Sequence, residues 1–263
     1  LTPPKEFWDL YEGVDFTLPA QSPAPEDLMA NSLFASMTAV SPDQHQRIAR
    51  GYFAMVSLID RCIGKILDAL DTLGLSEDTL VVATSDHGEQ LGHRCLYSKC
   101  YGFDPSLRVP LFLRAPGTVR AGLRQDAMIE HIDLLPLIFD ALKLSPMPGS
   151  GKSFWGLCTG NGDDPPGQRD SIYSSWAGGQ VFRTRTAKFI RRRSPEGKVV
   201  EEAYDLVRDP DEQEDLIDSA KGTALRAVFE KRVAELGFSE FRNDLDGTHL
   251  CIDQPPLIPY FTT

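Results

Sequence analysis

The sequence predicts an α/β protein with a layered α/β/α core and a small carboxy-terminal antiparallel sheet that carries a helix. Three observations support this fold class. An amphipathic helical pattern over residues 41–74 is followed by a short apolar run at residues 79–84, and this order forms half of a βαβ unit. Further apolar runs and a second helix alternate up to about residue 144. Beyond residue 170, apolar and polar residues alternate with the period of antiparallel strands.

The long helix is expected to begin at Ser41-Pro42-Asp43, because serine caps exposed N–H groups, proline fits the first helical position and aspartate suits the helix dipole. Apolar residues then recur every three or four positions until Gly74, where we expect the helix to end. This spacing places them on one face, which we expect to lie against a sheet. The prolines of residues 1–40 predict that no long regular element precedes this helix.

Three apolar runs predict the strands of the core. Residues 79–84 are typical of a central parallel strand that is covered on both sides. Residues 109–113 and 128–132 predict a second and a third strand. Asp133 is placed to cap a helix over residues 134–144, whose apolar side chains fall on one side.

Composition divides the chain into three parts. Residues 1–150 form part of the α/β core, the glycine- and proline-rich residues 151–170 are interpreted as a linker, and residues 171–263 form a small α+β subdomain. Strands of that subdomain are expected near residues 171–173, 180–184, 188–191 and 199–206, and a helix near 223–236. That helix would turn these residues toward the sheet: Leu225, Val228, Phe229, Val233 and Leu236. The three arginines at 191–193 are expected at an exposed hairpin edge.

The composition also argues against two classes of partner. The 263 residues are 41% hydrophobic and 25% charged, as in an ordinary globular protein. The formal net charge of -11 disfavours nucleic acid, because lysine and arginine must supply the attraction to phosphate. No apolar stretch approaches the roughly 18 residues of a membrane span. We therefore expect neither partner, and the scattered cysteines predict reduced thiols. The sequence leaves the location open: a cytoplasmic one is slightly favoured, and a signal peptide could precede Leu1.

The main candidate for chemistry is Asp86-His87-Gly88, which follows the first predicted strand. In an open α/β sheet, the loops at the carboxyl ends of the strands form the ligand crevice. A carboxylate and a neutral imidazole are both metal ligands, and Gly88 allows a sharp turn around a bound ion. Taken alone, such a pair is also compatible with a structural or solvated role.

The residues that follow make this candidate more specific. Two residues separate Asp86-His87-Gly88 from Leu91-Gly92. Lys99 and the predicted strand Arg108-Val109-Pro110-Leu111 then follow. This ordered series resembles the sulfatases of the alkaline phosphatase superfamily, most closely the phosphonate monoester hydrolase and choline-sulfatase branch. The resemblance implies an alkaline phosphatase-like fold and metal-dependent hydrolysis of sulfate esters or of phosphonate or phosphate monoesters.

The resemblance also implies roles for individual residues. Asp86 and His87 would be two ligands of a divalent cation, Ca²⁺ or Mn²⁺, and Lys99 would be a catalytic and substrate-binding residue that contacts the sulfuryl or phosphoryl oxygens. The substrate would be a small anionic ester. The family converts a cysteine or serine in a C/S-x-P/A-x-R sequence to formylglycine, and no cysteine of this chain stands in that setting. We therefore expect the nucleophile to precede Leu1 and the chain to be the carboxy-terminal half of the enzyme.

Several alternatives stay open. His93 and Cys95 depart from the residues usual in the family and are expected to shape the substrate pocket, while a zinc site of His93, Cys95 and Cys100 is conceivable. A phosphodiesterase or nucleotide pyrophosphatase of the same superfamily, or a non-catalytic member that serves as a binding unit, would also fit the chain. His45 and His131 are expected to be surface or packing residues, and a homo-oligomer is left open.

Overall fold

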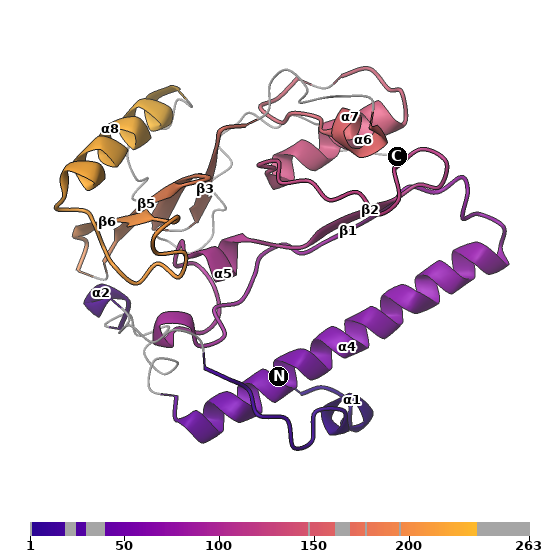
Figure 1. Ribbon diagram of the computed structural model, residues 1–263, viewed down its shortest axis with the longest axis horizontal. Coiled ribbons are helices and arrows are strands. Elements are labelled where there is room, and N and C mark those ends of the chain that lie inside the picture. Colours follow the sequence, from indigo (N-terminus) through magenta and orange to yellow (C-terminus); the bar gives the residue numbers. More distant parts are fainter. Residues whose placement is uncertain are drawn as a thin grey trace, which may run out of the picture. The chain divides into compact units, whose positions relative to one another are not determined.

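The computed structural model of the chain describes residues 2–18, 25–29, 40–146, 148–160, 169–176, 178–194 and 196–235. It divides into two compact units, residues 1–99 with 103–172, and residues 100–102 with 173–263. Figure 1 labels the helices and strands of both units. Within the described residues, no helix combines the length and the apolar character that crossing a membrane requires.

The long helix of the first unit, α4, spans Pro42–Thr72. It begins where predicted because Ser41 and Gln44 form a capping box: the Ser41 hydroxyl accepts the Gln44 N–H at 3.3 Å, and the Gln44 side chain accepts the Ser41 N–H at 2.8 Å. Gly74 follows the helix with a left-handed φ of 67°. Two short helices precede α4, namely α1 at Lys5–Asp9 and α2 at Glu26–Met29, so the expectation of no long element before residue 41 holds for the described residues there.

Within the described residues, the apolar face of α4 packs mainly against α1, and its predicted contact with a sheet stays a prediction. Helix α1 packs against α4, with Phe7 buried under the Arg61 guanidinium at 4.1 Å from the ring centre. Farther along the helix, the side chains of Val56, Ile59 and Ile66 are 45%, 53% and 61% exposed. The spacing of apolar residues correctly predicted one face, but spacing alone does not tell what covers it.

Strands β1 (Val81–Thr84) and β2 (Leu111–Arg114) form a two-stranded sheet. They pair antiparallel, with Val81 opposite Arg114 and Thr84 opposite Leu111, which corrects the predicted parallel strand. A parallel pair needs a long crossover, usually a helix. The chain between the two strands holds only a 3₁₀ turn at His93–Cys95 and the short helix α5 at Asp104–Leu107, and it returns alongside β1.

The third predicted strand is also absent from its place. Within residues 128–132, Met128 makes an isolated antiparallel bridge to Arg169, and a 3₁₀ turn follows at His131–Asp133. Helix α6, at Leu134–Ala141, is shorter than predicted. Asp133 stands at its start but makes no side-chain cap there, so the predicted capping role was wrong.

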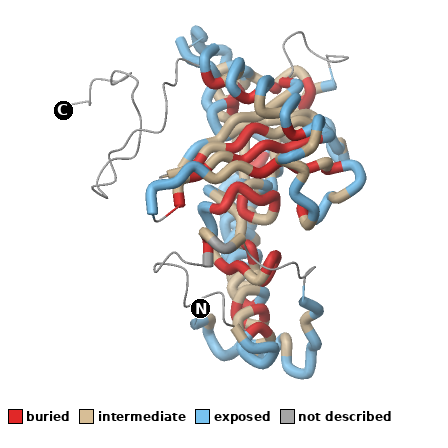
Figure 2. Tube along the Cα trace, turned by 90° about the vertical axis from the view of Figure 1, so that its left-hand side faces the viewer, coloured by how far each residue is buried: buried red, intermediate tan, exposed pale blue. Residues whose placement is uncertain are grey.

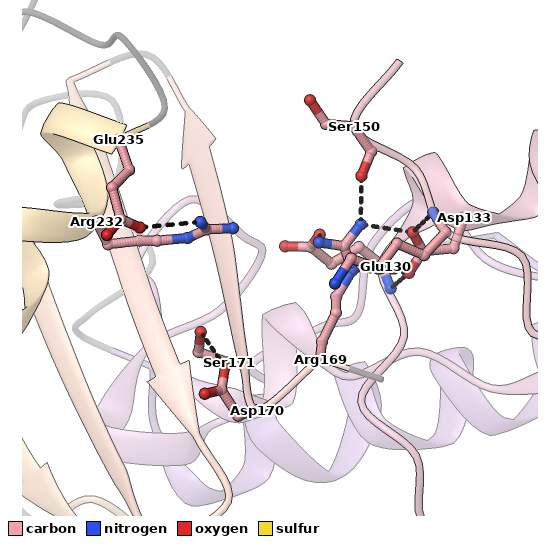
Figure 3. A network of polar contacts seen from close by, with 9 residues as sticks. Glu130, Asp133, Ser150, Arg169, Asp170, Ser171, Arg232 and Glu235 are labelled. Atoms are coloured by element: carbon pink, nitrogen blue, oxygen red, sulfur yellow. Dashed lines mark hydrogen bonds and ion pairs between the residues drawn. The ribbon is translucent and has the colours of Figure 1, made fainter. Parts of the chain in front are cut away.

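The Asp133 carboxylate instead organises a buried polar network (Figure 3). It accepts hydrogen bonds from Arg169 Nε at 3.0 Å and Nη2 at 2.6 Å, and from the backbone N–H groups of Glu130 and Lys152. Arg169 also pairs with Glu130 at 3.0 Å and donates to the Ser150 carbonyl at 2.9 Å. The Asp133 and Arg169 side chains are 3% and 6% exposed, so this network joins three chain segments inside the first unit.

The stretch interpreted as a linker contains packed structure in its first half. Helix α7 spans Trp155–Thr159. Phe154, Leu157 and Cys158 are buried together with Leu137 of α6, and side chains from β1 and β2 pack against this cluster. The apolar residues of α7 therefore belong to the core of the first unit, although glycine and proline dominate the sequence around them. Residues 161–168 lie outside the described part of the chain.

The second unit confirms the predicted small antiparallel sheet with its helix. Strands β3 (Ser171–Trp176), β4 (Gly179–Thr184), β5 (Ala187–Arg193) and β6 (Val199–Asp205) lie in that order, with β5 antiparallel to both neighbours. Buried positions run along β4, β5 and β6, whereas β3 has none (Figure 2). Helix α8 spans Ala220–Glu235, three residues earlier at its start than predicted.

Apolar side chains of α8 close the core of this sheet. Phe229 and Val233 are buried against Phe182 and Phe189, and the Phe229 and Phe189 rings lie 4.7 Å apart. Leu225 packs at the border of the cluster, as predicted. Val228 is 49% exposed and was wrongly placed in the core, while Leu236 lies outside the described residues.

The arginines of β5 do not mark an exposed edge. Strand β5 is internal to the sheet, and Arg192 is buried with its guanidinium paired to the Glu202 carboxylate. Arg191 donates from Nε to Glu201 at 2.8 Å and also pairs with Glu230 of α8. Arg191 and Arg192 thus have carboxylate partners on neighbouring elements, which is the condition under which a charge is tolerated in a core.

Candidate active site

The Asp86-His87-Gly88 motif directly follows β1 and is fixed against the α5 segment. Gly88 donates its N–H to the Ser106 carbonyl at 2.9 Å. A Cβ atom at Gly88 would lie only 2.0 Å from the Pro105 carbonyl oxygen. Glycine is therefore required here because two backbone segments approach closely, and not for the sharp turn that the sequence suggested.

Asp86 presents an ionised carboxylate at this position. Its Oδ1 accepts the backbone N–H of His87 at 2.9 Å, and this hydrogen bond is the main cause that holds the pKa of Asp86 below its usual value. The side chain is 83% exposed, so the described residues do not enclose it in the pocket that we expected. A low pKa keeps the oxygens negative and available to a cation over the neutral pH range.

The hydrogen bonds of His87 define its tautomer. Nδ1 lies 2.8 Å from the Gly88 carbonyl oxygen, which can only accept, so the ring proton sits on Nδ1. In the neutral ring this leaves a lone pair on Nε2, the form in which histidine binds metal ions. The fold thus directs the metal-binding nitrogen away from the backbone.

Lys99 lies at the same place, twelve residues along the chain. Its Nζ is 2.6 Å from His87 Nε2, a hydrogen bond in which the ammonium donates to the imidazole lone pair. Asp86 Oδ2 is 3.4 Å from the same nitrogen. The structure therefore brings together the three residues that the sequence singled out.

This arrangement fits a cation in part. Metal–oxygen and metal–nitrogen bonds of about 2.0–2.6 Å allow two donors that lie 3.4 Å apart to share one ion. Within the part of the chain that the structure describes, no group of three or more histidine, cysteine, aspartate or glutamate side chains could hold a metal ion. If Asp86 and His87 bind a cation, they are two donors of a set that needs further ligands.

The described residues give no support to the zinc alternative. Within the described ranges, His93, Cys95 and Cys100 do not form a metal-binding group. His93 is buried, with its ring centre 6.1 Å from that of Phe103. Its side chain contributes to the packing beneath the loop, and the expected role of His93 and Cys95 in a substrate pocket stays a prediction.

Two residues near the site were missed. His131 Nε2 donates to the Ser85 carbonyl at 2.8 Å, next to Asp86, although His131 was expected only to pack or lie at the surface. Glu89 accepts backbone hydrogen bonds from Leu91 and Ser98. Contacts of this kind join residues far apart in the sequence or depend on an irregular loop. The periodicity of the sequence therefore does not predict them.

Comparison with known families decides the relationship. Residues 20–144 match the family model described as "Sulfatase", and residues 92–238 match "N-sulphoglucosamine sulphohydrolase, C-terminal", which alone covers more than half of the chain. The chain belongs to the sulfatase family. The family predicted from the Asp86-to-Leu111 series is thereby confirmed, within the alkaline phosphatase superfamily.

Individual relatives agree with this assignment. An ulvan-active sulfatase of Formosa agariphila is 30% identical over 236 residues, which cover 84% of this chain and 44% of that protein. A choline-sulfatase of Rhizobium meliloti is 32% identical over 149 residues, 54% of this chain and 28% of that protein. The chain thus spans less than half the length of these two sulfatases.

The fold is shared with solved sulfatase structures. The structure of BT4656 in complex with its substrate D-glucosamine-2-N,6-O-disulfate superimposes with a TM-score of 0.78 at 18% identity, over 92% of this chain and 64% of that chain. At this identity the likeness establishes the fold alone. It confirms the predicted α/β, alkaline phosphatase-like fold class.

Proposed function

We propose that the protein hydrolyses sulfate esters and that this chain supplies Asp86, His87 and Lys99 to the active site. The observation that carries the proposal is the contact between Lys99 Nζ and His87 Nε2 at 2.6 Å, with Asp86 Oδ2 at 3.4 Å from the same nitrogen. An acid, an imidazole with its lone pair exposed and a primary ammonium thus meet at the end of one strand. Because the chain belongs to the sulfatase family, we assign these three groups to one site that hydrolyses sulfate esters.

Asp86 and His87 would hold a divalent cation together with ligands beyond the described residues. When bound, such a cation neutralises charge on the nucleophile and on the transferred sulfuryl group. Asp86 contributes its ionised carboxylate, and His87 contributes Nε2, which carries the lone pair in the neutral tautomer whose Nδ1–H donates to the Gly88 carbonyl. Ca²⁺ and Mn²⁺ both accept oxygen donors, and nitrogen from histidine suits Mn²⁺ better.

Lys99 would bind the sulfuryl oxygens. Its ammonium has three donors and a compact positive charge, which suits an anionic group whose charge is spread over several oxygens. The Nε2 lone pair of His87 serves one partner at a time. If Nε2 held a cation, the Lys99 ammonium would no longer donate to that nitrogen, and its protons would be available to the sulfuryl oxygens.

The substrate class that we propose is a sulfated carbohydrate. The relative from Formosa agariphila is named for activity on ulvan, and BT4656 was solved with D-glucosamine-2-N,6-O-disulfate as its substrate. Lys99 and the cation would recognise the sulfate group common to such esters.

The test compares hydrolysis of three esters that share one leaving group: 4-nitrophenyl sulfate, a 4-nitrophenyl phosphonate monoester and a 4-nitrophenyl phosphodiester. It uses the protein as its source produces it. We expect the sulfate ester to have the highest kcat/KM, and Lys99→Ala to lower that value by the equivalent of about 2–4 kcal/mol, the typical loss when one transition-state donor is removed. Lys143→Ala, which changes an exposed lysine of the same unit, is the matched control.

Each alternative predicts a different outcome of this test. Preference for the phosphodiester, with no effect of Lys99→Ala, would indicate a phosphodiesterase and overturn the proposal. Preference for the phosphonate would overturn the assignment to sulfate esters while keeping Lys99 in its role. No turnover of any ester would indicate a non-catalytic member that serves as a binding unit.

A further inference from the structure

The chain between His87 and Lys99 forms a closed, largely buried loop. Gln90 donates its N–H to the Ser98 carbonyl at 3.0 Å, and Gly92 donates to the Leu96 carbonyl at 2.8 Å, so the two halves of the loop pair with each other. Leu96 is 0% and Tyr97 4% exposed. Most connecting loops lie on the surface, and a buried one must satisfy its own backbone groups. This loop is therefore a built structure that ends at Lys99.

The backbone of this loop is strained. Four residues that are not glycine have left-handed φ angles within eight positions: Leu91 (44°), Arg94 (52°), Cys95 (58°) and Ser98 (72°). Side chains disfavour this conformation, and it persists where the surrounding contacts impose it. Strain of this kind concentrates at functional sites, where it sets the direction of a side chain. The contacts that impose it here should thus govern where Lys99 points.

Glu89 makes the contact that closes the loop at both ends. Its Oε1 accepts the N–H of Leu91 at 3.3 Å, at the entrance of the loop, and the N–H of Ser98, at its exit. Both donors belong to residues with left-handed φ. Ser98 precedes Lys99 directly, so one carboxylate oxygen holds the backbone from which the Lys99 side chain extends. Carboxylates that accept backbone N–H groups form stronger hydrogen bonds than neutral acceptors.

We propose that Glu89 is a positioning residue. By accepting the Leu91 and Ser98 N–H groups it joins the two ends of the 89–98 loop and thereby holds the Lys99 ammonium against His87. The role of Lys99 in hydrolysis rests on the proposed function, but the position of its side chain does not. A glutamate that merely added stability would leave the contact between Lys99 and His87 unchanged when replaced. A glutamate that acted only through its charge would be replaced by aspartate without effect.

Three variants of the full chain separate these roles. Glu89→Gln keeps an oxygen at the same reach but removes the charge. Glu89→Asp keeps the charge but withdraws the oxygen by one carbon–carbon bond, about 1.5 Å. Glu89→Ala removes the acceptor, and Glu77→Ala changes an exposed glutamate of the same unit as the matched control. NMR measures hydrogen exchange of the Leu91 and Ser98 amides and the nuclear Overhauser effect between the Lys99 side chain and the His87 ring.

We expect Glu89→Asp and Glu89→Ala to speed exchange at Ser98 by about tenfold or more, as for loss of a charged acceptor, and to lose the Overhauser effect. Glu89→Gln should stay within about fivefold of the original exchange rate and retain the effect. Protection of the α6 amides reports whether each variant is folded. An Overhauser effect that survives in Glu89→Asp, or that disappears in Glu89→Gln with α6 still protected, would overturn the proposal. None of these readouts depends on turnover, so failure of the proposed function leaves the test intact.

Discussion

Truncation of Asp133 should destabilise the first unit more than a typical substitution does. Asp133→Ala removes the acceptor of two Arg169 hydrogen bonds and of the N–H groups of Glu130 and Lys152. The Arg169 guanidinium is only 6% exposed and would keep Glu130 as its remaining carboxylate partner. Removing one partner of a buried ion pair lowers the free energy of unfolding by about 3–5 kcal/mol, and we expect a loss in that range.

The loss in the free energy of unfolding is measured by urea unfolding, with hydrogen exchange of the α6 amides as the readout. Helix α6 lies in the unit that holds the network. Asp170→Ala is the control, because Asp170 is an exposed neighbour that accepts the Ser171 hydroxyl at 3.1 Å (Figure 3). The triple variant Glu130→Gln, Asp133→Leu, Arg169→Met removes all three charges and should recover part of the loss. A loss below about 1 kcal/mol for Asp133→Ala would refute the reasoning, because it would mean that the carboxylate is dispensable to the buried arginine.

Three further outcomes follow from single contacts. Burial lowers the pKa of His45, whose Nδ1 lies 2.8 Å from the Tyr97 hydroxyl, so the folded state favours the neutral ring. The free energy of unfolding should therefore fall as pH drops through the ordinary histidine pKa. Urea titrations at several pH values measure this dependence, and His45→Gln should flatten it. Gly88→Ala should lower the free energy of unfolding by at least about 2 kcal/mol in the same assay, since its Cβ would meet the Pro105 carbonyl at 2.0 Å, and an unchanged value would contradict this packing. Phe229→Ala should cost the second unit about 3–5 kcal/mol, measured by exchange of its β5 amides, and a loss under about 1 kcal/mol would exclude it from the core.

Local signals in the sequence predicted those features that depend on a few neighbouring residues. The capping box of Ser41 and Gln44 lies within one helical turn, so the start of α4 could be placed correctly. The alternation of β4, β5 and β6 predicted a sheet of the right kind. The gathering of Asp86, His87 and Lys99 followed from the ordered series of residues that resembles the sulfatases, and not from periodicity.

Features that depend on distant partners could not be predicted in the same way. An apolar run indicates burial but not the direction of its neighbour, so the antiparallel pairing of β1 with β2 was missed. Arg192 appeared exposed because its partner, Glu202, lies on the next strand. Asp133 has the residue type of a helix cap, but its carboxylate instead accepts hydrogen bonds from Arg169, which lies far along the chain. Glu89 makes two backbone contacts and His131 makes one, and none of them leaves a pattern in the sequence.

The most direct test of the site is a titration of the chain with Mn²⁺ that is monitored through the NMR signals of the His87 ring. We expect paramagnetic broadening of these signals before those of other histidines, because Nε2 bears the lone pair and Asp86 Oδ2 lies 3.4 Å away. Asp86→Asn should raise the Mn²⁺ concentration required by at least about tenfold, while Asp43→Asn, at an exposed aspartate, should not. His87 signals that stay sharp while other histidines broaden, or that respond equally in both variants, would contradict the assignment of Asp86 and His87 as cation ligands.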